Sequence, residues 1–425
     1  MPLLTTAQKK HLLKRALANP LFLGAVARWL RRQARSAGDA YVPEALGWGA
    51  GELRDAAARR RPVVWCNVTV PSELIYGLGG IPVMPEMVAG FAAAWRGSPG
   101  LLAAADACGF SADLCSFHRC AVGLGLEGWL PRPDAVVACN LFCDGAKKFL
   151  RYLSHRQHVP FFLIDVPYRD GPEAIQHTAS SLQEVAQGLE EATRGRLSLR
   201  HLPHALELSN QARSYYLQAA DLRRSRPAPW RGSEALSYAA VFFMAFGSAG
   251  GVRIYRSLAE ALQHRTSHGQ AAVPQERHRL LWLHFRPFYA RELTDFLEVE
   301  RGGVIAAEEM SYLWWDELDP GDPFTSLARK LTSHFLWGPT ADRNRGRVAT
   351  MLYLAQEYGV DGVIHYSHWG CRQATGSVDL LRQACRRTGL PFLNLEGDCI
   401  DPRNGAEGQV RTRLEAFLES LASRR

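Results

Sequence analysis

The sequence predicts an α/β protein whose chain forms two successive lobes, each built on a parallel β-sheet. Two observations carry this prediction. Short, continuous apolar runs alternate with longer amphipathic stretches, a pattern typical of buried parallel strands separated by helices. The pattern occurs twice, from residue 62 and again from residue 279, with a helix-rich stretch between the two series. A length of 425 residues, 47% of them hydrophobic, supplies enough apolar material for several cores.

Residues 1–60 predict a helical N-terminal appendage, because apolar side chains recur there at helical spacing, as at Leu12, Leu13, Ala16 and Leu17. The first α/β lobe is expected over residues 61–175. Its strands should lie in the apolar runs 62–68, 134–139 and 160–165.

Residues 176–272 predict a linking helical region, with the clearest helical patterns at 181–192 and 206–223. The second α/β lobe is expected over residues 273–425, with strands at 279–285, 303–307, 361–365 and 391–395. Helical patterns fall between and after these strands, at about 290–300, 323–336, 342–358, 374–388 and 407–422. Since ligands bind at the carboxyl ends of parallel strands, a cleft between the two lobes is the expected ligand site.

The charge balance is basic, with 50 Lys and Arg against 42 Asp and Glu. Much of the excess is arginine in short clusters, which suits solvated helix faces or an anionic ligand. No zinc-finger or RNA-binding signature occurs, so we expect no nucleic-acid partner. The sequence also lacks an uncharged apolar run of 18 residues and a signal-peptide core, so we expect no membrane association and a cytoplasmic location.

The nine cysteines are odd in number and irregularly spaced, which argues against a disulfide framework and leaves metal ligation or buried packing. Spacing by itself does not decide between these two, because free cysteines are often simply buried. The local sequence favours a metal or cluster site. Cys115, Cys143 and Cys371 each have polar and cationic neighbours in the sequence, which stabilise a thiolate.

Several sequence blocks carry a family resemblance. The stretch 65–82, which contains Cys66 and Glu73, resembles the opening motif of the 2-hydroxyacyl-CoA dehydratase and benzoyl-CoA reductase family. The blocks 115–119, 143–148, 368–372, 396–403 and 408–417 are similar to the later motifs of that family, in the same order. The resemblance therefore runs from about residue 60 to 420.

The resemblance implies two Rossmann-like or flavodoxin-like lobes around a 4Fe-4S cluster, held by three cysteines with one iron left open. Position by position, the three ligands are Cys115, Cys143 and Cys371. Cys120 and Cys139 are near enough in sequence to substitute, although packing beneath the cluster is the plainer interpretation of both.

The chemistry implied is reduction by a single low-potential electron. An open iron can bind a thioester carbonyl, and the electron can give a ketyl radical anion that expels an α-hydroxyl group. In the reductase branch the electrons enter an aromatic ring instead. The sequence has no Gly-x4-Gly-Lys-Ser/Thr loop, so ATP hydrolysis should come from a separate iron-sulfur activator that donates the electron. The other expected partners are an acyl-CoA substrate and a homologous cluster-bearing subunit, as a homodimer or heterodimer.

Further residues have both a functional and a plainer interpretation. Glu73 is a candidate catalytic carboxylate for proton transfer or a helix-start residue, and His368, with Tyr366, could hydrogen-bond a cluster sulfur or fill the core. Arg403, Arg411 and Arg413 are candidates for binding the coenzyme A phosphates or a subunit interface, or only keep a helix surface soluble. The pair Trp314 and Trp315 suits the core or an interface, with an aryl or acyl pocket as the alternative.

Two alternative functions stay open. One is the double-cubane branch of the family, with an 8Fe-9S cluster, since Cys66 stands where that branch has its opening cysteine. Against it, no cysteine lies between Cys120 and Cys139, where a further ligand is expected. The other is a non-catalytic structural partner subunit.

Overall fold

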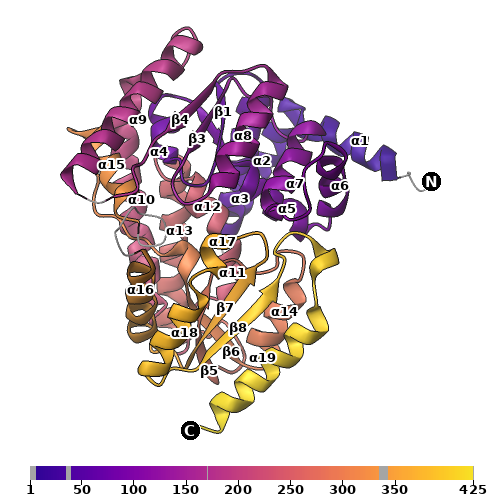
Figure 1. Cartoon of the computed structure of the whole chain (residues 1–425), viewed down its shortest axis with the longest axis vertical. Coiled ribbons are helices and arrows are strands. Elements are labelled where there is room, and N and C mark those ends of the chain that lie inside the picture. Colours follow the sequence, from indigo (N-terminus) through magenta and orange to yellow (C-terminus); the bar gives the residue numbers. More distant parts are fainter. Residues whose placement is uncertain (1–5, 35–39, 170, 335–342, 425) are drawn as a thin grey trace.

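Two parallel-sheet lobes lie one above the other along the longest axis of the molecule (Figure 1). The computed structural model describes residues 6–34, 40–169, 171–334 and 343–424. Each lobe contains a four-stranded sheet, with strand order β2-β1-β3-β4 in the first and β6-β5-β7-β8 in the second. All pairings within both sheets are parallel. The predicted α/β fold with two parallel-sheet lobes is therefore confirmed.

The strands of the first sheet follow the apolar runs of the sequence. Its two central strands, β1 and β3, are buried at every position, and β4 at the edge is partly exposed. The strand bounds are β1 Val63–Cys66, β2 Ile81–Val83, β3 Ala135–Cys139 and β4 Phe161–Ile164. The three predicted strands are confirmed. Strand β2 was not predicted, because it spans only three residues and includes a proline.

Helices cover this sheet and continue into a helical region. The first-lobe helices include α8, which packs on β3, and α9, which packs on β3 and β4. The helices before the second sheet are α1 Thr6–Leu17, α2 Pro20–Ala34, α3 Tyr41–Ala57, α4 Ser72–Gly77, α5 Pro85–Ala94, α6 Ser98–Ala107, α7 Ser116–Leu126, α8 Asp144–Gln157, α9 Pro172–Ala192, η1 Leu199–His201, α10 Leu202–Leu222, α11 Gly232–Ser237, α12 Ala239–Met244 and α13 Ala249–Ser267. The predicted boundary at residue 175 falls inside α9.

The second sheet repeats the first, with its central strands fully buried. Its strands are β5 His278–Leu283, β6 Gly303–Glu308, β7 Gly362–His368 and β8 Phe392–Gly397. The accompanying helices are α14 Arg291–Asp295, η2 Phe296–Glu300, η3 Glu309–Ser311, α15 Pro323–Thr332, α16 Arg343–Glu357, α17 Arg372–Thr375, α18 Val378–Arg387, η4 Pro402–Asn404 and α19 Glu407–Ala422. Helix α15 crosses to the other lobe, since it packs against α9 and α10 (Figure 1).

The same aspartate device opens the third strand of each sheet. Asp134 precedes β3, donates its N–H to the carbonyl of Val63 at 2.7 Å, and accepts the Val63 N–H at 2.8 Å. Asp361 makes the equivalent pair of hydrogen bonds with Arg279 of β5, at 2.7 and 2.8 Å. Each aspartate thus fixes the register of the third strand against the first.

A buried ion pair joins the second sheet to the helices beside it. Arg347 of α16 binds both carboxylate oxygens of Glu309, at 2.5 and 2.7 Å. The Glu309 carboxylate also accepts the backbone N–H of His284, just after β5, at 3.0 Å. Arg347 further donates to the carbonyl of Ala374 at 3.0 Å and the hydroxyl of Ser377 at 2.6 Å. One guanidinium therefore holds the α17 turn against the end of the sheet.

Within the described ranges, no helix is both long enough and apolar enough to span a bilayer.

Replacing Arg347 with Met should strongly destabilise the protein. The substitution leaves the Glu309 carboxylate buried without its cation, which typically costs about 3–5 kcal/mol of unfolding free energy. The surface pair Arg382 and Asp379, 3.2 Å apart, provides the control. Replacing Arg382 with Met should cost about 0–1 kcal/mol. Urea unfolding followed by tryptophan fluorescence measures both, and equal effects would contradict the role given to Arg347.

Candidate functional site

The three predicted cysteine ligands share one local setting, because each is the residue immediately before a helix. Cys115 precedes α7, Cys143 precedes α8 and Cys371 precedes α17. Helix-start N–H groups donate to each sulfur: those of Phe117 and His118 to Cys115, that of Ala146 to Cys143, and those of Gln373 and Ala374 to Cys371. Such donors stabilise negative charge on a sulfur.

The structure brings these cysteines together from both lobes. Burial raises the pKa of Cys115, and the nearby Cys371 and Cys143 raise it further. Burial also raises the pKa of Cys371, to about 11, and Cys143 again contributes. A Cβ atom on Gly370 would lie 2.3 Å from the Cα of Cys115, so the turn that carries Cys371 packs directly on the Cys115 backbone. Only glycine allows this approach.

A histidine contacts the sulfur of Cys143. His118 Nε2 lies 4.0 Å from Cys143 Sγ and 3.1 Å from Glu86 Oε1. Burial would lower the pKa of His118, but Cys143 and Glu86 outweigh burial and raise that pKa to about 10. Burial likewise disfavours the Cys143 thiolate, yet His118 holds the pKa of Cys143 below its ordinary value. Cys143 is therefore the cysteine whose surroundings most favour a thiolate.

A second histidine contacts Cys115. His368 Nε2 lies 3.4 Å from Cys115 Sγ, and its Nδ1 accepts the backbone N–H of Cys399 at 3.1 Å. Because Nδ1 accepts, the proton of the neutral ring is on Nε2 and points to the sulfur. Burial lowers the pKa of His368, which keeps the ring neutral. His368 thus lies where the sequence predicted a hydrogen bond to a ligand sulfur, whereas the Tyr366 hydroxyl points to the carbonyl of Asp398 instead.

Glu73 lies fully buried on α4 and forms an ion pair. Its Oε1 accepts from Lys330 Nζ at 2.6 Å and from the Ser209 hydroxyl at 2.8 Å. Its Oε2 has no hydrogen-bond partner among the described residues. Burial lowers the pKa of Lys330, while Glu73 opposes that shift. The ammonium also lies 3.8 Å from the centre of the Trp315 ring. The catalytic role of Glu73 stays a prediction.

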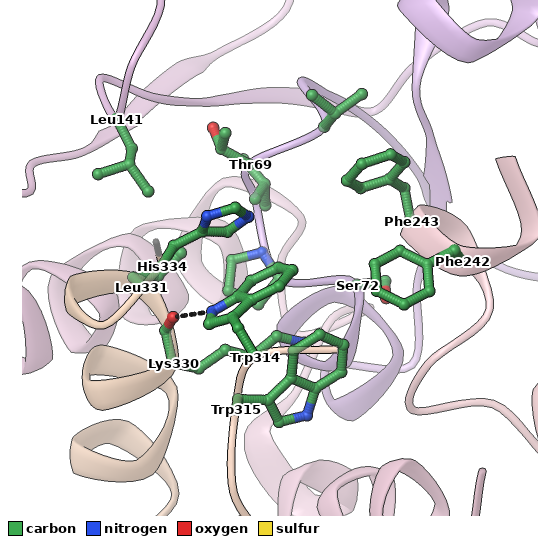
Figure 2. Close-up of a pocket in the computed structure, with 13 residues that line it drawn as sticks. Thr69, Ser72, Leu141, Phe242, Phe243, Trp314, Trp315, Lys330, Leu331 and His334 are labelled. Atoms are coloured by element: carbon green, nitrogen blue, oxygen red, sulfur yellow. Dashed lines mark hydrogen bonds between the residues drawn. The ribbon is translucent and has the colours of Figure 1, made fainter. Parts of the chain in front are cut away.

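An aromatic pocket adjoins this ion pair (Figure 2). It is a cavity of about 30 Å³ whose lining includes Phe242, Phe243, Trp314, Trp315, Leu141 and Lys330. Leu141 connects it to the cysteines, since its carbonyl accepts the Cys143 N–H at 3.0 Å. Val68 also lines it and donates its N–H to Glu86, the partner of His118. The pocket wall is therefore continuous with the surroundings of Cys143.

The donor set of this site suits a cluster better than a single ion. No three His, Cys, Asp or Glu side chains in the described part of the chain are placed to hold one metal ion. A cluster separates its ligands more widely, because each cysteine binds a different iron. Three buried thiols from three segments, with N–H donors at each sulfur, fit that second geometry. The ligand roles themselves stay a prediction.

The other candidate residues lie apart from this arrangement. Cys66 and Cys139 are buried within strands β1 and β3, and Cys120 is buried in α7, so none of these begins a helix. Each arginine candidate has a partner: Arg403 pairs with Asp401 at 2.7 Å, Arg411 with Glu300 at 3.4 Å, and Arg413 donates to the carbonyl of Asn394 at 2.6 Å. Their coenzyme A or interface roles stay predictions.

Sequence reasoning did not identify Lys330, Glu86 or Cys399 as parts of the site. Cys399 is fully buried, and Cys115 and Cys371 are close enough to raise its pKa. Its place in the block 396–403 was a usable signal. Lys330 and Glu86 carry no motif, and their roles come only from partners distant in the sequence.

Comparison with known proteins identifies relatives over nearly the whole chain. The alpha subunit of (R)-phenyllactyl-CoA dehydratase from Clostridium sporogenes is 23% identical over 91% of this chain and 96% of its own length. The alpha subunit of (R)-2-hydroxyisocaproyl-CoA dehydratase from Clostridioides difficile is 23% identical over 86% and 91%. A subunit of benzoyl-CoA reductase from Thauera aromatica is 23% identical over 83% and 87%.

A family model extends this likeness to the arrangement of the site. The model described as 2-hydroxyglutaryl-CoA dehydratase, D-component, matches residues 67–421, a range that contains Glu73, all three helix-start cysteines and the aromatic pocket. The chain belongs to the 2-hydroxyglutaryl-CoA dehydratase D-component family.

Proposed function

We propose that this chain is the iron-sulfur catalytic subunit of an enzyme acting on CoA thioesters. The observation that carries the proposal is the meeting of Cys115, Cys143 and Cys371 between the lobes, each at the start of a helix. The names of the relatives support the reaction class, since they are dehydratase and reductase subunits that act on CoA thioesters.

In this proposal the three cysteines hold a 4Fe-4S cluster. When bound, the cluster would supply a low-potential electron and an open iron position for the thioester carbonyl. Among the residues of the chain, His118 and His368 direct N–H groups at two of the sulfurs. Glu73 holds its carboxylate beside the pocket, where its unpartnered Oε2 can accept a proton. The apolar rings of the pocket exclude water from the bound acyl group.

The proposal includes three partners. A separate ATP-hydrolysing activator donates the electron, because this chain contains no phosphate-binding loop of its own. The other two partners are an acyl-CoA substrate and a homologous subunit. Dehydration of a 2-hydroxyacyl-CoA through a ketyl radical and reduction of an aromatic acyl-CoA both use this site, and the relatives include both kinds of enzyme.

One cluster accounts for the cysteines better than the double-cubane alternative does. Burial raises the pKa of Cys66, Cys120 and Cys139, which stabilises the neutral thiols. A non-catalytic subunit is disfavoured because the helix-start cysteines and their histidine partners are all present.

Protein purified without oxygen should contain about four irons and four acid-labile sulfides per chain, in line with one cubane. Iron and sulfide analysis with EPR of the dithionite-reduced protein measures this. About eight irons would replace the proposal with the double-cubane alternative, and no iron would remove its basis.

Replacing Cys115, Cys143 or Cys371 with Ser should each remove most of the iron. Losing an outer-shell partner of a ligand already weakens metal binding by about 10–100-fold, and losing a ligand should weaken it more. Cys385 is the matched control, because it is a buried cysteine of α18 whose sulfur contacts Met351 in a separate apolar cluster. Full iron content in the three variants, or equal loss in C385S, contradicts the ligand assignment.

Replacing His368 with Phe should make the midpoint potential of the cluster more negative by tens of millivolts. The N–H group of His368 stabilises the more electron-rich reduced state, and roughly 1 kcal/mol of lost preference corresponds to about 40 mV for one electron. Phe keeps the ring packing against Phe117. An EPR-monitored redox titration measures the shift, with the exposed His177 replaced by Phe as the control. An unchanged potential in H368F would contradict the hydrogen bond.

A further inference from the structure

The aromatic pocket has an apolar wall built from interlocked rings. Trp314 and Trp315 lie with their ring centres 4.6 Å apart, and Phe242 lies 5.7 Å from Trp315 and 5.5 Å from Phe243. Figure 2 shows these rings around the cavity with Leu141 and Leu331 on its other side. A ligand group here would contact mainly carbon.

The pocket offers no free positive charge to an anionic group. Lys330 is the only Lys or Arg among the described lining residues, and Glu73 already neutralises it at 2.6 Å. His334 also lines the pocket, and burial together with the charge of Lys330 lowers its pKa well below its ordinary value, so the ring is neutral. A carboxylate entering the pocket would lose its hydration without gaining a cation.

We propose that this pocket binds the acyl group of the CoA thioester and selects an apolar, uncharged acyl chain over one that ends in a carboxylate. This inference rests on the proposed function and adds the substrate class to it. The names in the family span both classes, because 2-hydroxyglutaryl carries a second carboxylate, whereas phenyllactyl and 2-hydroxyisocaproyl do not. The lining of the pocket favours the second class for this chain.

The size of the cavity adds a conformational requirement. About 30 Å³ holds little more than one water molecule, so an acyl chain enters only when a lining side chain turns away. Trp314 is the residue assigned to this movement. It is half-buried, and its Nε1 donates a single hydrogen bond to the carbonyl of Lys330 at 2.9 Å (Figure 2). Acyl binding should therefore change the fluorescence of Trp314.

The test compares two ligands that differ only at the end of the chain. Pentanoyl-CoA and glutaryl-CoA both have five acyl carbons, but glutaryl-CoA ends in a carboxylate, and neither carries the 2-hydroxyl group that dehydration removes. Isothermal titration calorimetry on the anaerobically purified protein gives both dissociation constants, with free coenzyme A as the reference. Pentanoyl-CoA should bind at least about 100-fold more tightly than glutaryl-CoA, because the carboxylate is buried without a partner.

Two variants locate the selectivity at the ion pair. Glu73→Gln removes the charge that neutralises Lys330, so the affinity for glutaryl-CoA should rise at least about tenfold while that for pentanoyl-CoA changes little. Ser209→Ala removes the other hydrogen bond to Glu73 but keeps the ion pair, so its selectivity should match that of the unaltered protein. Should E73Q fail to fold, the comparison of the two ligands on the unaltered protein still decides the proposal.

Fluorescence provides an independent readout. Pentanoyl-CoA should change the tryptophan emission of the unaltered protein and of Trp29→Phe, in which an exposed ring of α2 is replaced. The change should be largely absent in Trp314→Phe. A full response in W314F overturns the movement assigned to Trp314.

The failures of the two proposals are distinguishable. Equal affinities, or tighter binding of glutaryl-CoA, overturn the acyl selectivity and leave the CoA-thioester function intact. If neither thioester nor free coenzyme A binds at millimolar concentration, the proposed function fails and the selectivity fails with it.

Discussion

The buried pair between Arg347 and Glu309 is the interaction on which the geometry of the site depends. Glu309 follows β6 and fixes the backbone of His284 after β5, while Arg347 holds the turn at Ala374. The α17 turn begins directly after Cys371, so this network positions that sulfur opposite Cys115. His284 has a φ of +68°, an uncommon value for a non-glycine residue, and its hydrogen bond to Glu309 holds it there.

The two lobes place their cysteines by the same topological rule. Strand orders 2-1-3-4 and 6-5-7-8 are equivalent, and in both lobes the first and third strands lie side by side at the centre. Cys143 follows β3 and Cys371 follows β7, so the two residues occupy corresponding positions in the two sheets. Cys115, at the start of α7, has no cysteine counterpart in the second lobe. Two lobes with facing strand ends therefore supply an unsymmetrical set of three sulfurs, as an open-sided cluster site requires.

Local pattern was enough to predict most of the fold and the cysteines of the site. Buried strands such as β3 and β7 are continuous apolar runs, and the motif blocks around Cys115, Cys143 and Cys371 are specific. What the sequence did not reveal depends on tertiary contacts. The partners Glu73 and Lys330 are 257 positions apart, and nothing in the apolar face of α15 signals that it crosses to α9. The aromatic pocket was open to two interpretations from Trp314 and Trp315, since its other rings come from α12.

Charge explains why these three cysteines are arranged unlike the other buried ones. Burial and mutual repulsion raise the pKa of Cys115, because three thiolates in one place repel each other. The helix-start N–H groups and His118 offset part of that repulsion, and they make ionisation favourable chiefly at Cys143. A cationic iron centre would offset the remainder, since metal-bound cysteines are deprotonated. The site thus combines donors arranged for three thiolates with too little positive charge of its own, and this imbalance supports the proposal that iron binds there.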